Sequence, residues 1–160
     1  MKLRQFPLTA ASSSGFSLIE LMIAVAIVAI LAAIAFPMYT KQVQHSRRVD
    51  ARTAVLDIAG REERYLSTNS TYTNSPANLG YTAAAAFPMT VGSGYYQVNV
   101  TVAAGVPPLG PTYTAFAVPV AGSSQVNDLA CQYFSVDNTG FQFSSATGVG
   151  GTNTASICWQ

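Results

Sequence analysis

The sequence predicts an α+β fold in which one long N-terminal helix packs on a four-stranded antiparallel sheet. Three patterns support this prediction. Residues 16–36 form an apolar run, residues 38–66 carry apolar side chains at helical spacing, and apolar and polar side chains alternate after residue 95. A sheet with one apolar face needs a cover, and segment 38–66 is the amphipathic helix that can supply it. The length of 160 residues suits one globular head with an appended segment.

The first fifteen residues read MKLRQFPLTAASSSG, with two early cations and a finish of small polar side chains. This composition is typical of a targeting segment and not of a folded element. We therefore expect residues 1–15 to be a leader peptide.

The apolar run predicts a transmembrane helix over residues 16–37. Glu20 is the only ionisable side chain in residues 16–36. A helix of this length covers roughly 30 Å, the thickness of the hydrocarbon core of a bilayer. The alternative is a conventional secretory signal cleaved after Ala33-Ile34-Ala35, but such signals have a shorter apolar region and no carboxylate within it.

An amphipathic helix is expected over residues 38–66, continuous with the apolar run. Its predicted buried face carries Ala51, Ala54, Val55, Ile58, Glu62 and Tyr65. Pro37 lies inside this long helix, where it removes a backbone hydrogen bond and clashes with the preceding turn, so we expect a kink or local melting there. The alternative is that Pro37 ends the membrane helix and a second helix starts at Met38.

The head is predicted from residue 95 onward, after an irregular connection over residues 67–94 that is rich in Ser, Thr, Asn and Ala. Its four strands are expected at residues 95–103, 112–120, 129–136 and 141–144. In the second strand, Phe116, Val118 and Val120 are predicted to form the apolar face. The sequence Asp137-Asn138-Thr139-Gly140 predicts a hairpin turn.

The two cysteines, Cys131 and Cys158, lie beyond the apolar run. An even number of cysteines in an exported domain favours a disulfide over a metal site, and no CxxC or histidine-rich spacing supports zinc. Two buried free thiols are the alternative, which fits poorly with a membrane anchor. We expect a C-terminal disulfide loop and neither a metal nor another cofactor.

Charged residues are too few for most catalytic or nucleic-acid-binding sites. They make up 9% of the chain, no Lys or Arg follows Arg64, and the only acids after Tyr65 are Asp128 and Asp137. The single histidine, His45, lies on the charged part of a helix and is expected at the surface. With so few acids and a single histidine, we expect no enzyme. Because duplex binding draws most of its affinity from Lys and Arg at phosphates, we expect weak nucleic-acid binding at most.

The string Gly15-Phe16-Ser17-Leu18-Ile19-Glu20, followed by the apolar helix and Pro37, resembles the class III signal of type IV pilins and the related pseudopilins. The resemblance implies that a prepilin peptidase cleaves after Gly15, that the new Phe16 amine is methylated, and that the helix remains as membrane anchor and filament core. It also implies that Glu20 is an assembly residue, which pairs with the Phe16 amine of a neighbouring chain. Snorkelling of Glu20 to the membrane interface is the alternative for a free subunit.

Shorter motifs resemble PilE-like minor pilins, the group that also contains DNA-uptake receptors. They are Arg47-Arg48-Val49-Asp50-Ala51, Tyr95-Tyr96, the predicted hairpin turn and Cys158-Trp159. The resemblance implies a minor or major subunit of a type IV pilus, serving pilus assembly, adhesion, twitching motility or DNA uptake. It would sit in the bacterial inner membrane, contact other pilin subunits and the assembly platform, and then enter the extracellular pilus. The alternatives are a DNA receptor on the pilus surface and a type II secretion pseudopilin, whose usual calcium site the scarce acids disfavour.

Overall fold

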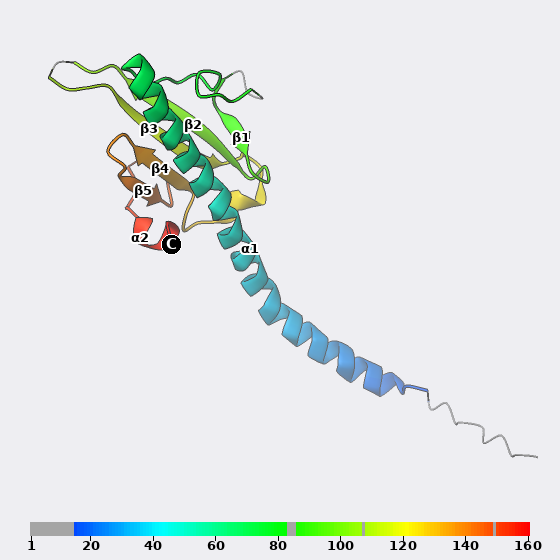
Figure 1. Cartoon of the computed structure of the whole chain (residues 1–160). Coiled ribbons are helices and arrows are strands. Elements are labelled where there is room, and N and C mark those ends of the chain that lie inside the picture. The colour runs from blue at the N-terminus through cyan, green and yellow to red at the C-terminus, as the bar shows by residue number, and fades with distance from the viewer. Residues whose placement is uncertain (1–14, 83–85, 107, 149) are drawn as a thin grey trace, which may run out of the picture. The chain divides into compact units, whose positions relative to one another are not determined.

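The computed structural model describes residues 15–82, 86–106, 108–148 and 150–160 (Figure 1). The predicted leader lies almost wholly outside the described residues. The chain divides between Tyr39 and Thr40 into two compact units.

Helix α1 (Leu18–Asn69) runs through both predicted helical segments, with Pro37 inside it. The single continuous helix confirms that no second helix begins at Met38, and no melting is seen at Pro37. The kink expected at Pro37 stays a prediction.

The first unit presents an apolar helix surface. Its large side chains are exposed on every side, from 77% for Leu18 to 53% for Ile27. Within the described residues, α1 is the one helix long and apolar enough to cross a membrane, by length and composition alone. An apolar surface of this extent is stable only against lipid or other protein.

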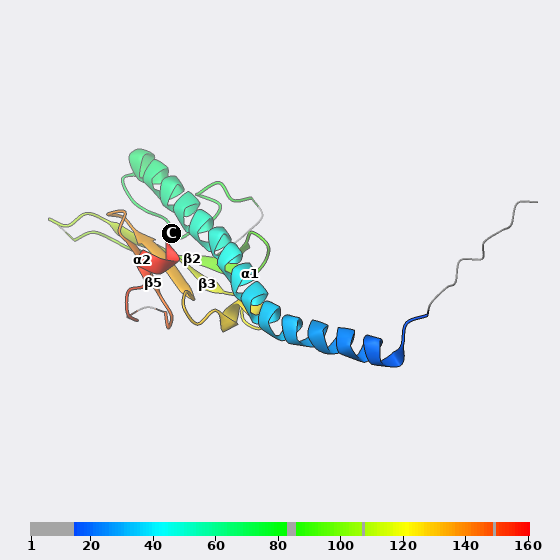
Figure 2. The same cartoon turned by 90° about the horizontal axis from the view of Figure 1, so that it is seen from below.

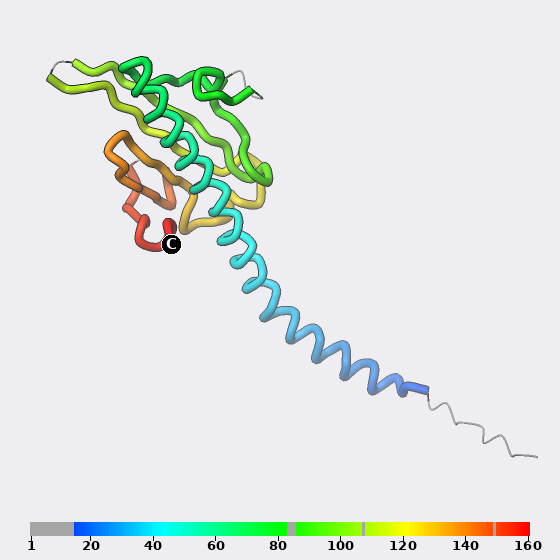
Figure 3. The backbone as a smooth tube through the Cα atoms, in the orientation of Figure 1, coloured from blue at the N-terminus to red at the C-terminus, as the bar shows by residue number. Residues whose placement is uncertain are grey.

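The second unit is built on a fully antiparallel five-stranded sheet with the order β1-β2-β3-β4-β5. Its strands are β1 (Met89–Val91), β2 (Tyr96–Ala103), β3 (Thr112–Pro119), β4 (Tyr133–Asp137) and β5 (Gln142–Ser145). Figure 3 follows them in chain order, ending at the C-terminal segment beside β5. Two short helices complete the head, η1 (Ser124–Asn127) between β3 and β4, and α2 (Ala155–Cys158) after β5.

The predicted meander is confirmed, but the prediction of four strands is wrong by one. Strand β1 lies in the segment that was predicted to be irregular, and it pairs with β2 from Met89 opposite Val98 to Val91 opposite Tyr96. A strand of three residues is too short to show an alternating pattern, so only its pairing reveals it. Strand β4 also begins at Tyr133 and not at Leu129.

The core of the head lies between the second half of α1 and one face of the sheet (Figure 2). The predicted helix face is confirmed, since Ala51, Val55, Ile58 and Glu62 are all fully buried. The three apolar side chains of this face share one core cluster with Tyr96, Val98 and Phe134 of the sheet. Burial of these aliphatic and aromatic groups is the main source of stability for such a head.

The prediction for the apolar face of β3 is wrong. Tyr113, Ala115 and Ala117 face the core with at most 3% of their surface exposed, whereas Phe116 lies on the outer face and is half-buried. Both faces of this strand are apolar, so alternation alone cannot say which face the helix covers. On the outer face the ring of Phe116 stacks on Tyr133, with 5.6 Å between the ring centroids.

Candidate functional site

The start of α1 carries the residues predicted for processing and assembly. Gly15, Phe16 and Ser17 precede the helix and are exposed. The Ser17 hydroxyl accepts a hydrogen bond of 3.2 Å from the backbone N–H of Glu20, and the Ser17 carbonyl accepts one of 3.2 Å from the N–H of Leu21. Ser17 therefore caps the helix, with Glu20 in its first turn, where a carboxylate is favoured by the helix dipole. Phe16 lies four positions before Glu20 in the sequence.

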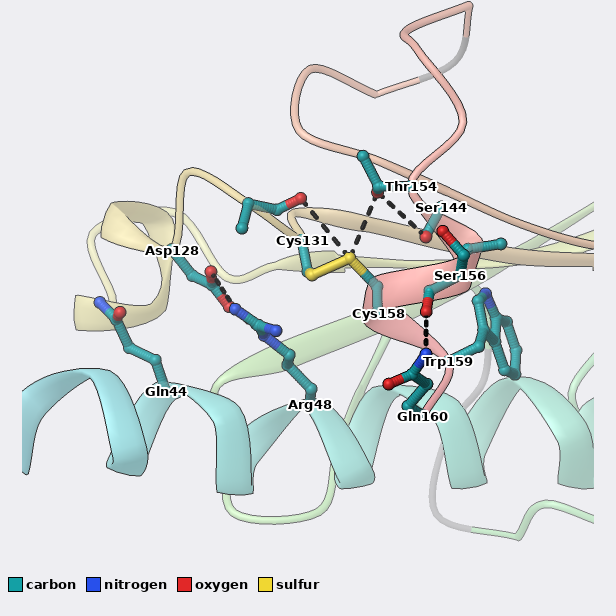
Figure 4. Close-up of a disulfide and its surroundings, with 12 residues drawn as sticks. Gln44, Arg48, Asp128, Cys131, Ser144, Thr154, Ser156, Cys158, Trp159 and Gln160 are labelled. Atoms are coloured by element: carbon teal, nitrogen blue, oxygen red, sulfur yellow. Dashed lines mark hydrogen bonds and ion pairs between the residues drawn. A yellow bond between two sulfur atoms is a disulfide. The ribbon is translucent and has the colours of Figure 1, made fainter.

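The predicted disulfide is confirmed. Cys131 and Cys158 are bonded to each other, with 5.8 Å between their Cα atoms, and both are buried (Figure 4). The bond joins the segment after η1 to α2. The Thr154 hydroxyl lies 3.2 Å from the Cys158 sulfur and 3.1 Å from the Ser144 hydroxyl. The alternative of two free thiols is wrong.

The C-terminal segment is also hydrogen-bonded to strand β5. The Thr154 N–H donates to the Ser144 carbonyl at 2.7 Å, and the indole N–H of Trp159 donates to the Phe143 carbonyl at 3.2 Å. The Trp159 ring packs edge-on against Phe134, with 6.0 Å between centroids. These bonds satisfy backbone groups at the edge of the sheet, where a free strand would invite pairing with other chains.

A buried polar cluster, which we call the η1 clamp, fixes the β3–β4 connection to α1. The Arg48 guanidinium donates two hydrogen bonds to the Asp128 carboxylate, at 2.7 and 2.8 Å (Figure 4). Their side chains are only 12% and 3% exposed. The Gln125 amide donates to the Tyr96 hydroxyl and to Asp128, each at 3.0 Å, and to the Gln44 carbonyl at 3.3 Å. The clamp therefore links helix, sheet and connection through charged and polar groups that are shielded from water.

A family model described as "Type IV minor pilin ComP, DNA uptake sequence receptor" matches residues 37–135, well over half of the chain. A second model, "Prokaryotic N-terminal methylation motif", matches residues 11–36. The chain belongs to the type IV pilin family. The match to the methylation motif covers the Gly15–Glu20 string and most of the apolar helix.

Curated relatives of this pilin are similar over part of their length. It is 40% identical over 96 residues to the type IV major pilin protein PilE1 of Neisseria gonorrhoeae, covering 58% of this chain and 41% of the relative. It is 37% identical over 67 residues to the type IV major pilin protein PilA of Myxococcus xanthus, covering 42% and 30%. It is 36% identical over 96 residues to a fimbrial protein of Pseudomonas aeruginosa, covering 56% and 60%. The pilin thus spans less than two thirds of each of these relatives.

Most cations of the pilin head are engaged in contacts within the head. The Arg47 guanidinium lies 3.5 Å from the centroid of the Tyr95 ring and donates to the Ser124 hydroxyl at 2.7 Å. Arg52 donates to the backbone carbonyl of Gln160. Arginine stacked on a ring or bonded to a carboxylate or carbonyl is less free to bind an external anion.

Arg61 is held in a similar way near the end of α1. It donates to the Asp57 carboxylate at 2.9 Å and to the Leu79 carbonyl at 2.8 Å, and its guanidinium lies 4.4 Å from the centroid of the Tyr81 ring. Among the described residues, Lys41 and Arg64 are the two cations of the head whose side chains make no hydrogen bond or ion pair.

Acids on α1 hold the connection that follows the helix. Glu62 is fully buried, and one of its oxygens accepts the Thr73 N–H at 3.1 Å while the other has no partner within the described structure. Burial raises the pKa of the Glu62 carboxyl, because the charged form loses its water. The neighbouring Glu63 accepts the Tyr72 hydroxyl at 3.0 Å, and burial together with this acid raises the pKa of Tyr72 to about 12.

The described part of the chain contains no group of three or more His, Cys, Asp or Glu side chains arranged to hold a metal ion. The η1 clamp was not predicted from the sequence, although one signal was present. Asp128 is one of two acids in a stretch without cations, so a partner on the helix was the simplest expectation.

Proposed function

We propose that this pilin is a structural subunit of a type IV pilus, without a catalytic step or a cofactor. The observation that carries the proposal is the exposed apolar first unit of α1, capped by Ser17 and carrying a single carboxylate in its first turn. Residues 16–37 would anchor the subunit in the bacterial inner membrane and then pack against other pilins in the extracellular pilus.

Processing is proposed at the bond between Gly15 and Phe16. Both residues are exposed and precede the first helical turn, so a prepilin peptidase could reach an extended segment without unwinding α1. Cleavage would remove residues 1–15 and leave the Phe16 amine, the group that the methylation motif modifies, about one turn from Glu20.

Glu20 is proposed to guide assembly on the inner-membrane platform. An ionised carboxylate within a membrane helix costs on the order of 3 kcal/mol on insertion scales, so it favours any state in which a cation neutralises it. The Phe16 amine of a neighbouring subunit is such a cation, and it lies at the same end of its helix as Glu20. Pairing of the two groups would set the axial register between subunits.

The test compares each variant's amount in sheared filaments with its amount in the membrane. Glu20→Ala should remain inserted and cleaved, because its helix becomes more apolar, but its share in filaments should fall roughly tenfold or more, since the partner amine is left unpaired among packed helices. Glu20→Gln is the matched control that keeps the shape and should fall less. Mass analysis of the wild-type filament should find a mature chain that begins at Phe16.

Two results would contradict this proposal. Incorporation of Glu20→Ala at the wild-type ratio would remove Glu20 from assembly. A mature chain that begins at Phe36 would instead support the conventional secretory signal.

A second candidate function is a DNA-uptake receptor on the pilus surface, favoured by the description of the matching family model. Against it, the described contacts leave Lys41 and Arg64 as the cations free to meet phosphates, and nonspecific duplex binding depends on such cations. Adhesion, twitching motility and DNA uptake would each follow from the filament and need no chemistry within the head.

A further inference from the structure

The connection between β2 and β3 ends in an exposed apolar tip, formed by Val106 and Leu109. These side chains are 72% and 75% exposed. The Leu109 N–H donates to the Val106 carbonyl at 2.7 Å. A Cβ added at Gly105 would lie 2.4 Å from the carbonyl carbon of Gly110, so the two ends of the connection are in backbone contact and hold the tip in place.

An apolar pocket lies at the opposite end of β3. The cavity has a volume of about 280 Å³ and is lined by Val118, Pro119, Val126 and the ring of Tyr133, with Gln132 and Thr147 at its polar side. Tyr133 belongs to the outer face of the sheet, where it stacks on Phe116, so the pocket faces away from α1. Liquid water takes up roughly 30 Å³ per molecule, so a cavity of this volume is large enough to receive an aliphatic side chain.

The tip and the pocket cannot meet within one chain. The tip precedes Thr112 and the pocket begins at Val118, and a strand rises about 3.3 Å per residue, so β3 keeps them on the order of 20 Å apart. A tip that fills the pocket of another copy leaves its own pocket open for a third. Contacts of this head-to-tail kind generate rings or open helical filaments and not two-fold dimers.

Charge places no obstacle to this contact. No Lys, Arg, Asp, Glu or His occurs in residues 101–127, which include the tip and most of the pocket, and the remaining lining residues are also uncharged. Two such surfaces can meet without burying an unpaired charge, which would cost several kcal/mol per ion.

We propose that the apolar tip of one copy of this pilin occupies the outer-face pocket of the next copy along the pilus. The inference rests on the proposed function, because the contact exists only in the filament. One tip in one pocket buries far less area than the roughly 1,600 Å² of a stable interface. The contact therefore orients the heads, while the apolar helices supply most of the free energy of association.

The test introduces two cysteines into the full-length chain, Leu109→Cys and Val126→Cys, and oxidises sheared filaments. The native disulfide is closed and buried, so the introduced thiols are the only free ones. Tip and pocket in contact would bring the new cysteines within the roughly 4.4 to 6.8 Å between Cα atoms that a disulfide needs. We expect a ladder of dimers, trimers and longer species.

The matched control pairs Leu109→Cys with Thr139→Cys, which is exposed on the β4–β5 turn at the tip end of the sheet. The control should cross-link about tenfold less between copies, because the proposed contact places the tip at the pocket of the next copy, at the opposite end of β3 from its Thr139. Filaments that contain the Leu109→Cys, Val126→Cys variant but yield only monomers would overturn the contact and leave the pilus role intact. Dimers from Leu109→Cys alone would also overturn it, since the tips would then meet each other. Absence of the wild-type chain from filaments would overturn both proposals.

Discussion

Replacing Asp128 with alanine should remove a large part of the stability of the head. The change deletes two hydrogen bonds of 2.7 and 2.8 Å to Arg48 and one of 3.0 Å from Gln125. The Arg48 side chain is 12% exposed, so its charge would stay largely out of water without a partner. Breaking a buried ion pair costs about 3 to 5 kcal/mol, and the partial exposure of Arg48 favours the lower end, about 3 kcal/mol. Small domains have only about 5 to 15 kcal/mol in total.

The assay is urea denaturation of the full-length chain in detergent micelles, with the disulfide kept oxidised. Trp159 is the only tryptophan and packs on Phe134 in the head, so its fluorescence reports unfolding there. With a urea slope of about 1 to 3 kcal/mol per molar, a loss of about 3 kcal/mol lowers the midpoint by roughly 1 to 3 M.

Two controls separate buried charge from lost contacts. Asp57→Ala breaks an ion pair with Arg61 of 2.9 Å and a hydrogen bond from the Tyr81 hydroxyl, but the two ion-paired side chains are 45% and 30% exposed, so the loss should be about 1 to 2 kcal/mol. The double variant Arg48→Met, Asp128→Leu should recover most of the stability, because no charge is left buried. An Asp128→Ala midpoint no lower than that of Asp57→Ala would refute the reasoning, as would a double variant as unstable as the single one.

Two further predictions concern protonation and DNA. Because burial raises the folded-state pKa of Glu62 above its ordinary value of 4.5, its contribution to stability is fully present below that value and is lost as the pH rises through the raised pKa. Glu62→Gln should therefore raise the urea midpoint at pH 7 and reduce its gain on acidification; equal pH profiles for wild type and Glu62→Gln would contradict this. The mature chain that begins at Phe16, and so lacks Lys2 and Arg4 of the leader, should bind duplex DNA weakly, with a salt slope no steeper than about −2, because Lys41 and Arg64 are the cations left free in the described head. Submicromolar binding with a steep slope, measured by titration at several salt concentrations, would support a receptor instead.

Local patterns predicted most of the helices and strands. The buried positions of α1 were identified because Ala51, Val55 and Ile58 recur at the helical period. The disulfide followed from two cysteines in an exported head. Strand β1 escaped prediction, since its three residues acquire their strand conformation by pairing with β2.

The η1 clamp depended on contacts that no local pattern encodes. Arg48 and Asp128 are 80 positions apart, and the charged face of an amphipathic helix normally points to water. Only the arrangement of helix and sheet brings these two side chains together, and only their burial makes the pair important for stability.

By itself, the sequence determined the apolar anchor with Glu20 near its start, the amphipathic second half of α1 and the alternation of the central strands, because side-chain periodicity and motif spacing are properties of neighbouring residues. The tertiary structure alone decided which face of β3 meets the helix, which cations remain free, and where the apolar tip and its pocket lie. Those features depend on segments far apart in the chain. Two apolar faces of a strand, or two arginines on one helix, are equivalent until the packing of the core buries one and exposes the other.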